Sequence, residues 1–532
     1  MSMELQEYIF EKKPKRRELL QYVPTQAQQH FCVQVFRNHS FELVEHTITA
    51  YLDYAHLGVS FSYSNYDDSF SFTDLNPEAD LLIVWIDGAR YQNISVQAFV
   101  SERIAALKAV FAKPVLVLAF RCDVQLQMAD VEVVNVSEIC AFLGDQMIDE
   151  RALGVTGTAL SSKAMLHISK VLGLQYLPVM LKPALKGIVV DFDNTLYHGV
   201  LGEDGIDGIV LTPGHIRLQK TLKRLSAQGF FLCAASKNEL EDVQKLLRNR
   251  EDFPLKEKDF TKLSVSWNPK ADAITEIAGF LNIHPDSLVF VDDNIGELTA
   301  VQMAHPQIKL IHAKEDANAT ADVLEMFPGL LKLHQTADDM KRSTDVRSNE
   351  ERQRLQQTMS HEDYIRSLQL HLTYEINNLE RKTRVSELAR KTNQFIFNYK
   401  RYSETEVEQL MTAEDSAVVT LSLSDKLSDS GLVGVFVGKK QADALVLEEC
   451  FVSCRALGRG IDEVMVQSAI QILIEHFCVE RALVQFQKGP RNAPAEAFVE
   501  KHLKNYCVNS SPFAYHIPGD LLKVTICGKK EN

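Results

Sequence analysis

Short, almost wholly apolar runs that alternate with stretches of helical spacing restrict this chain to a layered α/β fold. In the first third, such runs span residues 79–86 and 113–120, and apolar residues recur at helical spacing over 96–111 between them. Runs of this kind are typical of parallel strands that helices cover on both faces. The pattern therefore predicts a doubly wound α/β domain.

The pattern recurs in the middle of the chain and changes toward the C-terminus. Four further apolar runs predict a second parallel sheet: residues 187–190, 230–235, 288–291 and 308–311. A charged stretch without apolar runs follows and predicts a partly helical linker. Beyond it, strand-like runs and one long helical pattern predict a mixed domain: residues 417–421, 434–437, 444–447 and 522–526 for the strands and 461–477 for the helix.

The length of 532 residues fits three domains, at roughly 150 residues for each. We predict an N-terminal α/β domain over 1–183, a central α/β domain over 184–330, the charged linker over 331–366 and a C-terminal α+β domain over 367–532. The first domain offers no convincing Ser, Asp and His set for an esterase, so its role stays unassigned. Asp87 and Gly88, which follow an apolar run, are interpreted as a turn.

The charge and the cysteine content indicate which binding partners and which cellular compartment to expect. The chain carries 57 Lys and Arg against 71 Asp and Glu, a net charge of −14, which argues against a nucleic-acid partner. No apolar stretch approaches the roughly 20 residues of a membrane span, and the first 17 residues lack the apolar core of a signal peptide. Nine scattered cysteines favour reduced thiols. We therefore expect a cytoplasmic protein with no membrane partner.

Asp191 and Asp193, directly after the run 187–190, are the strongest functional signal. Two Asp separated by one residue project to the same side of an extended chain, so one can attack a substrate while the other moves a proton. Their charges repel each other unless a cation joins them, and oxygen ligands of this kind suit Mg²⁺. The pair predicts magnesium-dependent phosphoryl transfer.

Later strand and helix edges supply the remaining groups. Ser236 follows the run 230–235 and offers a hydroxyl to a phosphate oxygen, with Lys237 beside it. Lys270, at the start of a predicted helix, can neutralise charge on the nucleophile and on the transferring phosphoryl group. The predicted metal ligands are Asp191, Asp193, Asp292 and Asp293, the last two after the run 288–291.

This order of motifs, D-x-D-x-T, then Ser, Lys and Asp-Asp, resembles the haloacid-dehalogenase-like phosphatases. The stretch 191–205 is similar to the FkbH-like branch, subfamily IIIC, and so are five shorter segments: 236–238, 267–270, 291–294, 391–395 and 453–460. The resemblance covers the chain from about residue 181 to the C-terminus. It implies a haloacid-dehalogenase-like doubly wound parallel sheet for the central domain.

The resemblance also implies roles for single residues. Asp191 would be the nucleophile that forms an aspartyl-phosphate, and Asp193 the general acid and base. Ser236 would bind the phosphate, and Lys270 would stabilise charge. Substrate contacts are expected from Thr195, Lys237, Asn238 and His198.

For the activity, the resemblance implies a phosphorylated three-carbon acid of glycolysis, similar to 1,3-bisphosphoglycerate, as the substrate. Phosphate would be removed, and the acyl group would pass to the phosphopantetheine thiol of an acyl carrier protein. That acyl unit would then start or extend a polyketide-type product. The protein would thus be both a phosphatase and an acyltransferase.

Two departures from the branch keep other functions open. Tyr197, His198 and Gly199 stand where the branch has Trp-Gly-Gly, which leaves the substrate open. Carrier-loading members have a thioester-forming Cys just before the Ser-Lys-Asn motif, whereas this chain has Ala235 there and Cys233 two positions earlier. A plain small-molecule phosphatase and a non-catalytic scaffold that docks carrier proteins are the alternatives.

In the third domain, residues 455–460 have the form R-x-x-G-x-G between a strand and a helix. Acetyltransferase-like folds cradle a pyrophosphate in such a loop, because glycines let the backbone approach and the helix N-terminus presents N–H groups. The motif predicts an N-acetyltransferase-like domain that binds coenzyme A or a carrier-bound phosphopantetheine through Arg455, Gly458 and Gly460. A scaffold that keeps the loop for packing is the alternative, and Cys454 is a secondary thiol candidate.

Overall fold

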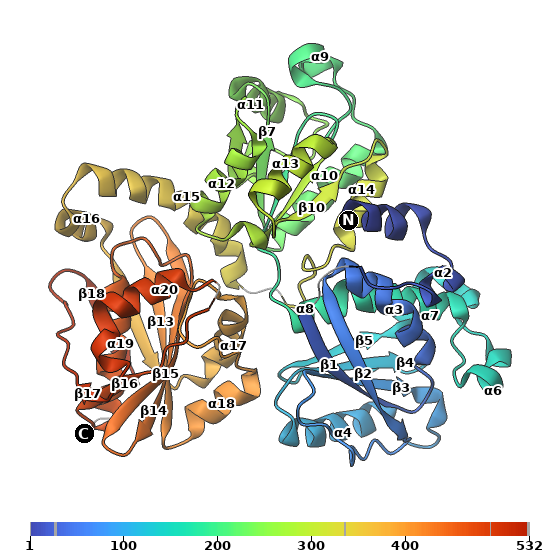
Figure 1. Ribbon diagram of the computed structural model, residues 1–532, viewed down its shortest axis with the longest axis horizontal. Helices are drawn as coiled ribbons and strands as arrows, with labels where there is room; N and C mark the ends of the chain where they lie inside the picture. Colours follow the sequence, from blue (N-terminus) through green and yellow to red (C-terminus); the bar gives the residue numbers. More distant parts are fainter. Residues whose placement is uncertain (1, 26–28, 335–336, 490, 529–532) are drawn as a thin grey trace.

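The computed structural model describes residues 2–25, 29–334, 337–489 and 491–528. Three lobes, each built around its own sheet, follow one another along the chain (Figure 1). Two of the sheets have five strands and are wholly parallel, and the third is a larger mixed sheet. The predicted fold class, a three-domain α/β protein with a central parallel sheet, is confirmed.

The N-terminal domain has the strand order β2-β1-β3-β4-β5. Its main elements are α1 (Ser2–Gln6), α2 (Arg16–Leu20), β1 (Gln29–Arg37), α3 (Glu42–Tyr54), β2 (Leu57–Tyr66), β3 (Leu81–Asp87), α4 (Val96–Val110), β4 (Val115–Phe120), β5 (Val131–Asn135), α5 (Val136–Ile139), α6 (Leu153–Thr156), α7 (Ser162–Val171) and α8 (Leu177–Leu181). The two strands expected from apolar runs, β3 and β4, are buried over their whole length, as the central strands of a covered sheet must be.

One stretch of this domain, Ser162–Leu181, is long and apolar enough to cross a membrane by length and composition. This corrects the expectation that no stretch comes near that limit. Within the fold, 56% of its most apolar window is buried, and α7 packs against α3, where the Thr47 and Ser169 hydroxyls lie 2.7 Å apart. Packing of this helix in the domain core accounts for its apolar composition.

The central domain has the order β10-β9-β6-β7-β8. Its elements are β6 (Gly187–Val190), α9 (Leu201–Gly208), α10 (Pro213–Ala227), β7 (Phe231–Ser236), α11 (Leu240–Asn249), β8 (Lys262–Val265), α12 (Lys270–Leu281), β9 (Leu288–Asp292), α13 (Ile295–Ala304), β10 (Lys309–His312) and α14 (Ala317–Glu325). All four apolar runs form strands. Because β6 lies between β9 and β7, the residues that follow these three strands meet at one edge of the sheet.

The first helix of the chain lies beside the central domain and not only beside its own sheet (Figure 1). The Gln6 side chain donates to His312 O at 2.9 Å and accepts from His312 N at 3.1 Å. Since β10 is the edge strand of the central sheet, this amide satisfies backbone groups that no neighbouring strand reaches.

The predicted linker is helical: it contains α15 (Ala337–Thr358) and α16 (His361–Leu368), while residues 335 and 336 lie outside the described residues. Two charged side chains of α15, Asp345 and Arg352, are buried against the C-terminal domain. Arg352 pairs with Asp425 at 2.9 Å, and Arg459 pairs with Asp345 at 3.1 Å. This buried network of four charges fixes the middle of α15, from Asp345 to Arg352, to the C-terminal domain.

The C-terminal sheet has the order β17-β16-β15-β14-β13-β11-β18, and β12 pairs with β15. Its elements are β11 (His371–Ile376), α17 (Lys382–Lys391), β12 (Phe395–Ile396), α18 (Glu404–Thr412), β13 (Ser416–Ser424), β14 (Asp429–Gln441), β15 (Ala444–Val452), α19 (Asp462–Phe477), β16 (Arg481–Val484), α20 (Ala493–Phe498), β17 (Ser511–Pro512) and β18 (Lys523–Cys527). The predicted long helix is α19, which packs its apolar side on this sheet.

Candidate active site

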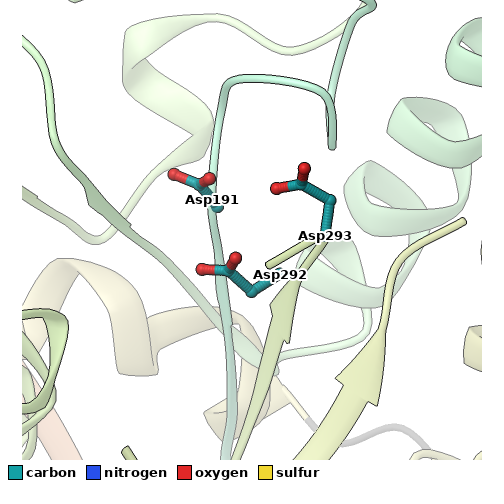
Figure 2. Close-up of side chains that lie close together, drawn as sticks. All are labelled: Asp191, Asp292 and Asp293. Atoms are coloured by element: carbon teal, nitrogen blue, oxygen red, sulfur yellow. The ribbon is translucent and has the colours of Figure 1, made fainter. Parts of the chain in front are cut away.

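Three carboxylates converge at the carboxyl edge of the central sheet (Figure 2). Asp191 directly follows β6, Asp292 ends β9 and Asp293 follows it. The pairing of Val190 with Val291 brings these strand ends level, and Asp191 N donates to Val291 O at 3.0 Å. One oxygen from each carboxylate lies within 4.8 Å of the others. Such a set of oxygen ligands fits Mg²⁺.

The Lys270 ammonium lies against two of these carboxylates. Its Nζ is 2.9 Å from Asp191 Oδ2 and 2.6 Å from Asp292 Oδ2. All three side chains are buried, and Lys270 is the first residue of α12. When the three carboxylates are ionised, one ammonium leaves two negative charges uncompensated, which a divalent cation would balance.

Burial raises the pKa of each of the three carboxyl groups, and the charge of Asp191 also raises the pKa of the other two. Burial and the charge of Asp191 together raise the pKa of Asp292 to about 7, against the opposing effect of Lys270. Burial also raises the pKa of Asp191 and of Asp293. Burial alone would lower the pKa of Lys270, but Asp191 and Asp292 outweigh it and the pKa is raised. The Lys270 ammonium therefore stays charged. Because the carboxyl groups have raised pKa values, binding of a metal ion to them would release a proton.

Asp191 keeps one oxygen available for chemistry. Its Oδ2 faces Lys270, whereas its buried Oδ1 has no hydrogen-bond partner among the residues that the structure describes. A buried carboxylate oxygen without a partner is costly unless a ligand or metal completes it. This oxygen is the atom expected to attack phosphorus or to bind the metal.

Asp193, which sequence reasoning also placed among the metal ligands, lies outside the cluster of three. Its Oδ1 accepts from the Tyr197 hydroxyl at 2.6 Å and from Leu201 N at 3.0 Å, and its Oδ2 accepts from Asn238 Nδ2 at 2.9 Å. Three donors thus hold this carboxylate in one orientation. Two nearby acids in such different surroundings suit a division into nucleophile and proton carrier.

Three further predicted residues, Ser236, Asn238 and Thr195, lie at the end of β7 or on the segments that follow β7 and β6. Ser236, the last residue of β7, is buried, and its Oγ accepts from Asn238 Nδ2 at 3.2 Å. Asn238 therefore links Ser236 to Asp193. Thr195 is buried in the turn after β6, and its hydroxyl has no hydrogen-bond partner among the described residues.

Lys237 and His198 have partners other than the three carboxylates. The Lys237 ammonium pairs with Glu297 of α13 at 2.5 Å and is 40% exposed. His198 is exposed, and its backbone pairs with Val210 by two hydrogen bonds of 2.9 Å. Their roles in substrate binding stay predictions.

Tyr197 is a site residue that sequence reasoning missed. It was considered only as a departure from the branch pattern, yet its hydroxyl holds Asp193. Burial and the charge of Asp193 both raise the pKa of Tyr197, so the phenol remains a hydrogen-bond donor. The signal available in the sequence was its position four residues after Asp193, which in a turn brings the two side chains together.

Cys233 lies in the apolar core and not at the carboxylate cluster. Its side chain is 0% exposed and packs with Phe231, Ala235 and Ile274 between β7 and α12. A thiol in this position does not meet an incoming substrate.

The predicted pyrophosphate loop of the C-terminal domain is divided between two cavities. Gly458 and Gly460, both with positive φ, line a cavity of about 730 Å³ together with His361 of α16. Arg455 instead lines a separate cavity beside the central domain. The structure does not bring Arg455 together with the two glycines.

The charged side chains that line the glycine-lined cavity determine which ligands it can bind. Asp462 and Glu463, in the first turn of α19, line it, and burial raises the pKa of Asp462 to about 6. Its two arginines, Arg352 and Arg459, are engaged in the buried ion-pair network with α15. Lys501 and His502 also line it, so a phosphate placed there would meet both acids and cations.

Comparison with known proteins finds no matching family model and no matching curated protein. Seven solved chains match. The N-terminal part of the protein BF1531 from Bacteroides fragilis, which contains a phosphatase domain complexed with Mg, matches at 18% identity over 60% of this chain and 100% of its own, with a TM-score of 0.46. An uncharacterised protein from Corynebacterium glutamicum matches at 18% identity over 27% of this chain and 95% of its own, with a TM-score of 0.19.

A HAD family enzyme from Bacteroides thetaiotaomicron, in complex with magnesium and inorganic phosphate, matches at 13% identity. That match covers 25% of this chain and 95% of the enzyme, with a TM-score of 0.21. Similarities this distant do not assign an activity, which has to come from the residues of the site.

Proposed function

We propose that the central domain is a magnesium-dependent phosphohydrolase of the haloacid-dehalogenase-like type. The observation that carries the proposal is the convergence of Asp191, Asp292 and Asp293 around one ammonium at the carboxyl edge of a parallel sheet. When bound by these carboxylates, Mg²⁺ would supply a Lewis acid that polarises the phosphoryl group.

The chain's own residues account for both halves of the reaction. Asp191 Oδ1 attacks phosphorus and forms an aspartyl-phosphate, while the bond from phosphorus to the leaving oxygen breaks and Asp193 gives that oxygen a proton. Asp193 then takes a proton from water as the water oxygen attacks phosphorus, which releases phosphate and restores Asp191. Lys270 offsets the negative charge at Asp191 throughout, and Asn238 and Tyr197 keep Asp193 oriented.

For the substrate, we propose a small phosphorylated acid similar to 1,3-bisphosphoglycerate, whose acyl unit is transferred to the phosphopantetheine thiol of an acyl carrier protein in polyketide-type biosynthesis. In that transfer the thiol sulfur attacks the acyl carbon, the bond from that carbon to the phosphate oxygen breaks, and the thiol proton leaves with inorganic phosphate. Asp191 would act on the remaining phosphate monoester. The motifs of the FkbH-like branch support this finer proposal. The glycine-lined cavity of about 730 Å³ supports it too, because thiol-bearing arms of coenzyme A or a carrier need a cleft of several hundred Å³. We also propose a cytoplasmic location, which agrees with the absence of any disulfide among the nine cysteines, all of which the structure describes.

A plain small-molecule phosphatase is the second candidate. The burial of Cys233 and the presence of Ala235 beside Ser236 favour it, because neither position offers an accessible thiol for a covalent acyl intermediate. In this case free acid would be the product whether or not a carrier protein is present.

One experiment separates these functions. A carrier protein with its phosphopantetheine arm is incubated with this protein, Mg²⁺ and 1,3-bisphosphoglycerate, and released phosphate and the intact mass of the carrier are measured together. A mass gain with phosphate release supports acyl transfer, and phosphate release without a mass gain supports the plain phosphatase.

The variant Asp191→Asn is the control for the nucleophile. It should abolish phosphate release while the protein stays folded. If Asp191→Asn retains magnesium-dependent turnover, Asp191 is not the nucleophile. If the wild-type protein binds the carrier and releases no phosphate, the hydrolase proposal is wrong and the protein is a docking scaffold.

A further inference from the structure

Basic side chains gather in a small cavity between the central and C-terminal domains. The cavity measures about 50 Å³, and five of its lining residues are cationic: Lys186, Lys332, Arg384, Lys391 and Arg455. None of its described lining residues is acidic. Arg455 is 4% exposed, so its guanidinium charge is held away from bulk water.

A second, wider cavity of about 630 Å³ adjoins the first. The two cavities share four lining residues, Ala184, Leu185, Lys186 and Asn393. The wider cavity adds three cations, Lys182, Lys309 and Arg491, and Asp286 is the one acid among its described lining residues. We call the two cavities together the basic junction.

Two described carboxylates pair with three of these cations. Glu387 pairs with Arg384 at 2.7 Å and also with Lys391 at 3.6 Å, and Asp286 pairs with Arg491 at 2.7 Å. This cluster of basic side chains occurs in a chain whose net charge is −14.

The pKa values of two lysines that line the wider cavity are lowered. Burial and the charge of Lys309 together lower the pKa of Lys182 to about 8. Burial also lowers the pKa of Lys309. An anion bound among these cations would relieve both effects.

The basic junction is distinct from the carboxylate cluster. Lys186 precedes β6 and Asp191 follows it, and Phe231, which also lines the small cavity, begins β7 while Ser236 ends it. The five-residue step from Lys186 to Asp191 corresponds to roughly 17 Å along an extended strand. An anion at the amino end of the sheet is therefore not the phosphate that Asp191 would attack.

We propose that the basic junction binds a phosphate-bearing small molecule, with its phosphate in the small cavity and its organic part in the wider one. Guanidinium and ammonium groups together are the usual partners of phosphate oxygens, and the hydroxyls of Thr392 and Ser453 line the same space. The small cavity suits a compact tetrahedral anion, and the wider one lies within the range of small-molecule sites, about 300–1,000 Å³.

Such a ligand would contact all three domains. Lys182 follows α8 of the N-terminal domain, Lys186 precedes β6 of the central domain, and Lys391 ends α17 of the C-terminal domain. Binding would therefore stabilise the arrangement of the three lobes. The proposal does not depend on hydrolysis at Asp191, and either can fail without the other.

The first test measures binding of inorganic phosphate by calorimetry in buffer with a chelator, so that no metal draws phosphate to the carboxylate cluster. We expect the wild-type protein and Asp191→Asn to bind phosphate equally. Lys391→Gln should weaken binding about tenfold or more, since a hydrogen bond to a charged group contributes about 1.5–3 kcal/mol. Lys382→Gln, at the other end of α17 in a pair with Glu408, is the matched control and should bind as the wild type does.

Three results would overturn the proposal: no phosphate binding to the wild-type protein at millimolar concentration, equal binding by Lys391→Gln and wild type, or loss of binding in Asp191→Asn. Because Lys391 is partly exposed, its variant should fold, and a thermal unfolding curve checks this. A second series uses 4′-phosphopantetheine, free and attached to a carrier protein. Tighter binding of the free arm than of inorganic phosphate supports a role for the wider cavity, and equal binding overturns it. Binding of only the attached arm identifies a carrier protein as the source of the phosphate.

Discussion

Replacing Lys270 with Gln should lower the rate of phosphate release about 100- to 1,000-fold while the protein remains folded. Lys270 Nζ contacts both Asp191 at 2.9 Å and Asp292 at 2.6 Å in a buried site. In the transition state the same ammonium faces the charge that develops between Asp191 and the phosphoryl group. Gln keeps much of the side-chain length and hydrogen bonding but carries no charge.

The magnitude follows from these contacts. Removal of one preorganised electrostatic donor costs about 2.7–4 kcal/mol in the transition state, and each 1.36 kcal/mol is about a tenfold change in rate. The cost in stability should stay below the roughly 3–5 kcal/mol of a broken buried ion pair, because Asp292, with a pKa already about 7, can bind a proton instead.

The assay is phosphate release from a phosphorylated acid at saturating Mg²⁺, with circular dichroism and thermal unfolding to verify the fold. Lys245→Gln is the control, because Lys245 lies in an exposed pair with Asp242 on α11. A Lys270→Gln rate within tenfold of the wild type, in a folded protein, would refute the assigned role of the ammonium.

Three further predictions follow from the same geometry. Asp193→Asn should lower kcat about 100- to 10,000-fold with little change in KM, because it removes the proton carrier; an unchanged kcat would exclude this role. Burial lowers the pKa of His39 to about 3, below the roughly 6.5 of an unfolded chain, so stability is lost as pH falls below about 6.5, by about 2 kcal/mol at pH 5. Thermal unfolding at pH 8 and pH 5 should show a smaller difference for His39→Phe. Arg352→Met leaves Asp345 and Asp425 with one arginine, and unfolding in urea should show a loss of about 3–5 kcal/mol; a loss below 1 kcal/mol, within the range of exposed pairs, would contradict the buried network.

Strands dominated by apolar residues were predictable, and so was β18 with its alternating apolar and polar residues, whereas β1 and β8 were not. Every run from 79–86 to 444–447 forms part of a strand, because such strands are covered on both faces and their burial shows in the sequence itself. Strand β1 was missed, since Gln29, His30 and Gln34 interrupt its apolar residues and only its second half is buried. The edge strand β8 has one fully buried residue, so its sequence carries little signal.

Some features of the candidate site could likewise be predicted from the sequence, and others could not. Asp191, Asp292 and Asp293 were predictable as neighbours because each follows an apolar parallel strand, and such strand ends share one edge of a sheet. The donors that hold Asp193 and the pairing of Lys237 with Glu297 depend on side-chain directions that no local pattern encodes.

The sequence by itself determined the α/β class, the order of the sheets and the acids at the central strand ends, since these depend on local periodicity and on what directly follows a strand. Only the tertiary structure decided what the charged residues do. Arg459, expected in a phosphate loop, is buried 3.1 Å from Asp345, which lies 114 positions earlier in the chain. Arg455 lines the basic junction instead. The physical reason is that a charge acts through its partners in space, and long-range packing chooses those partners.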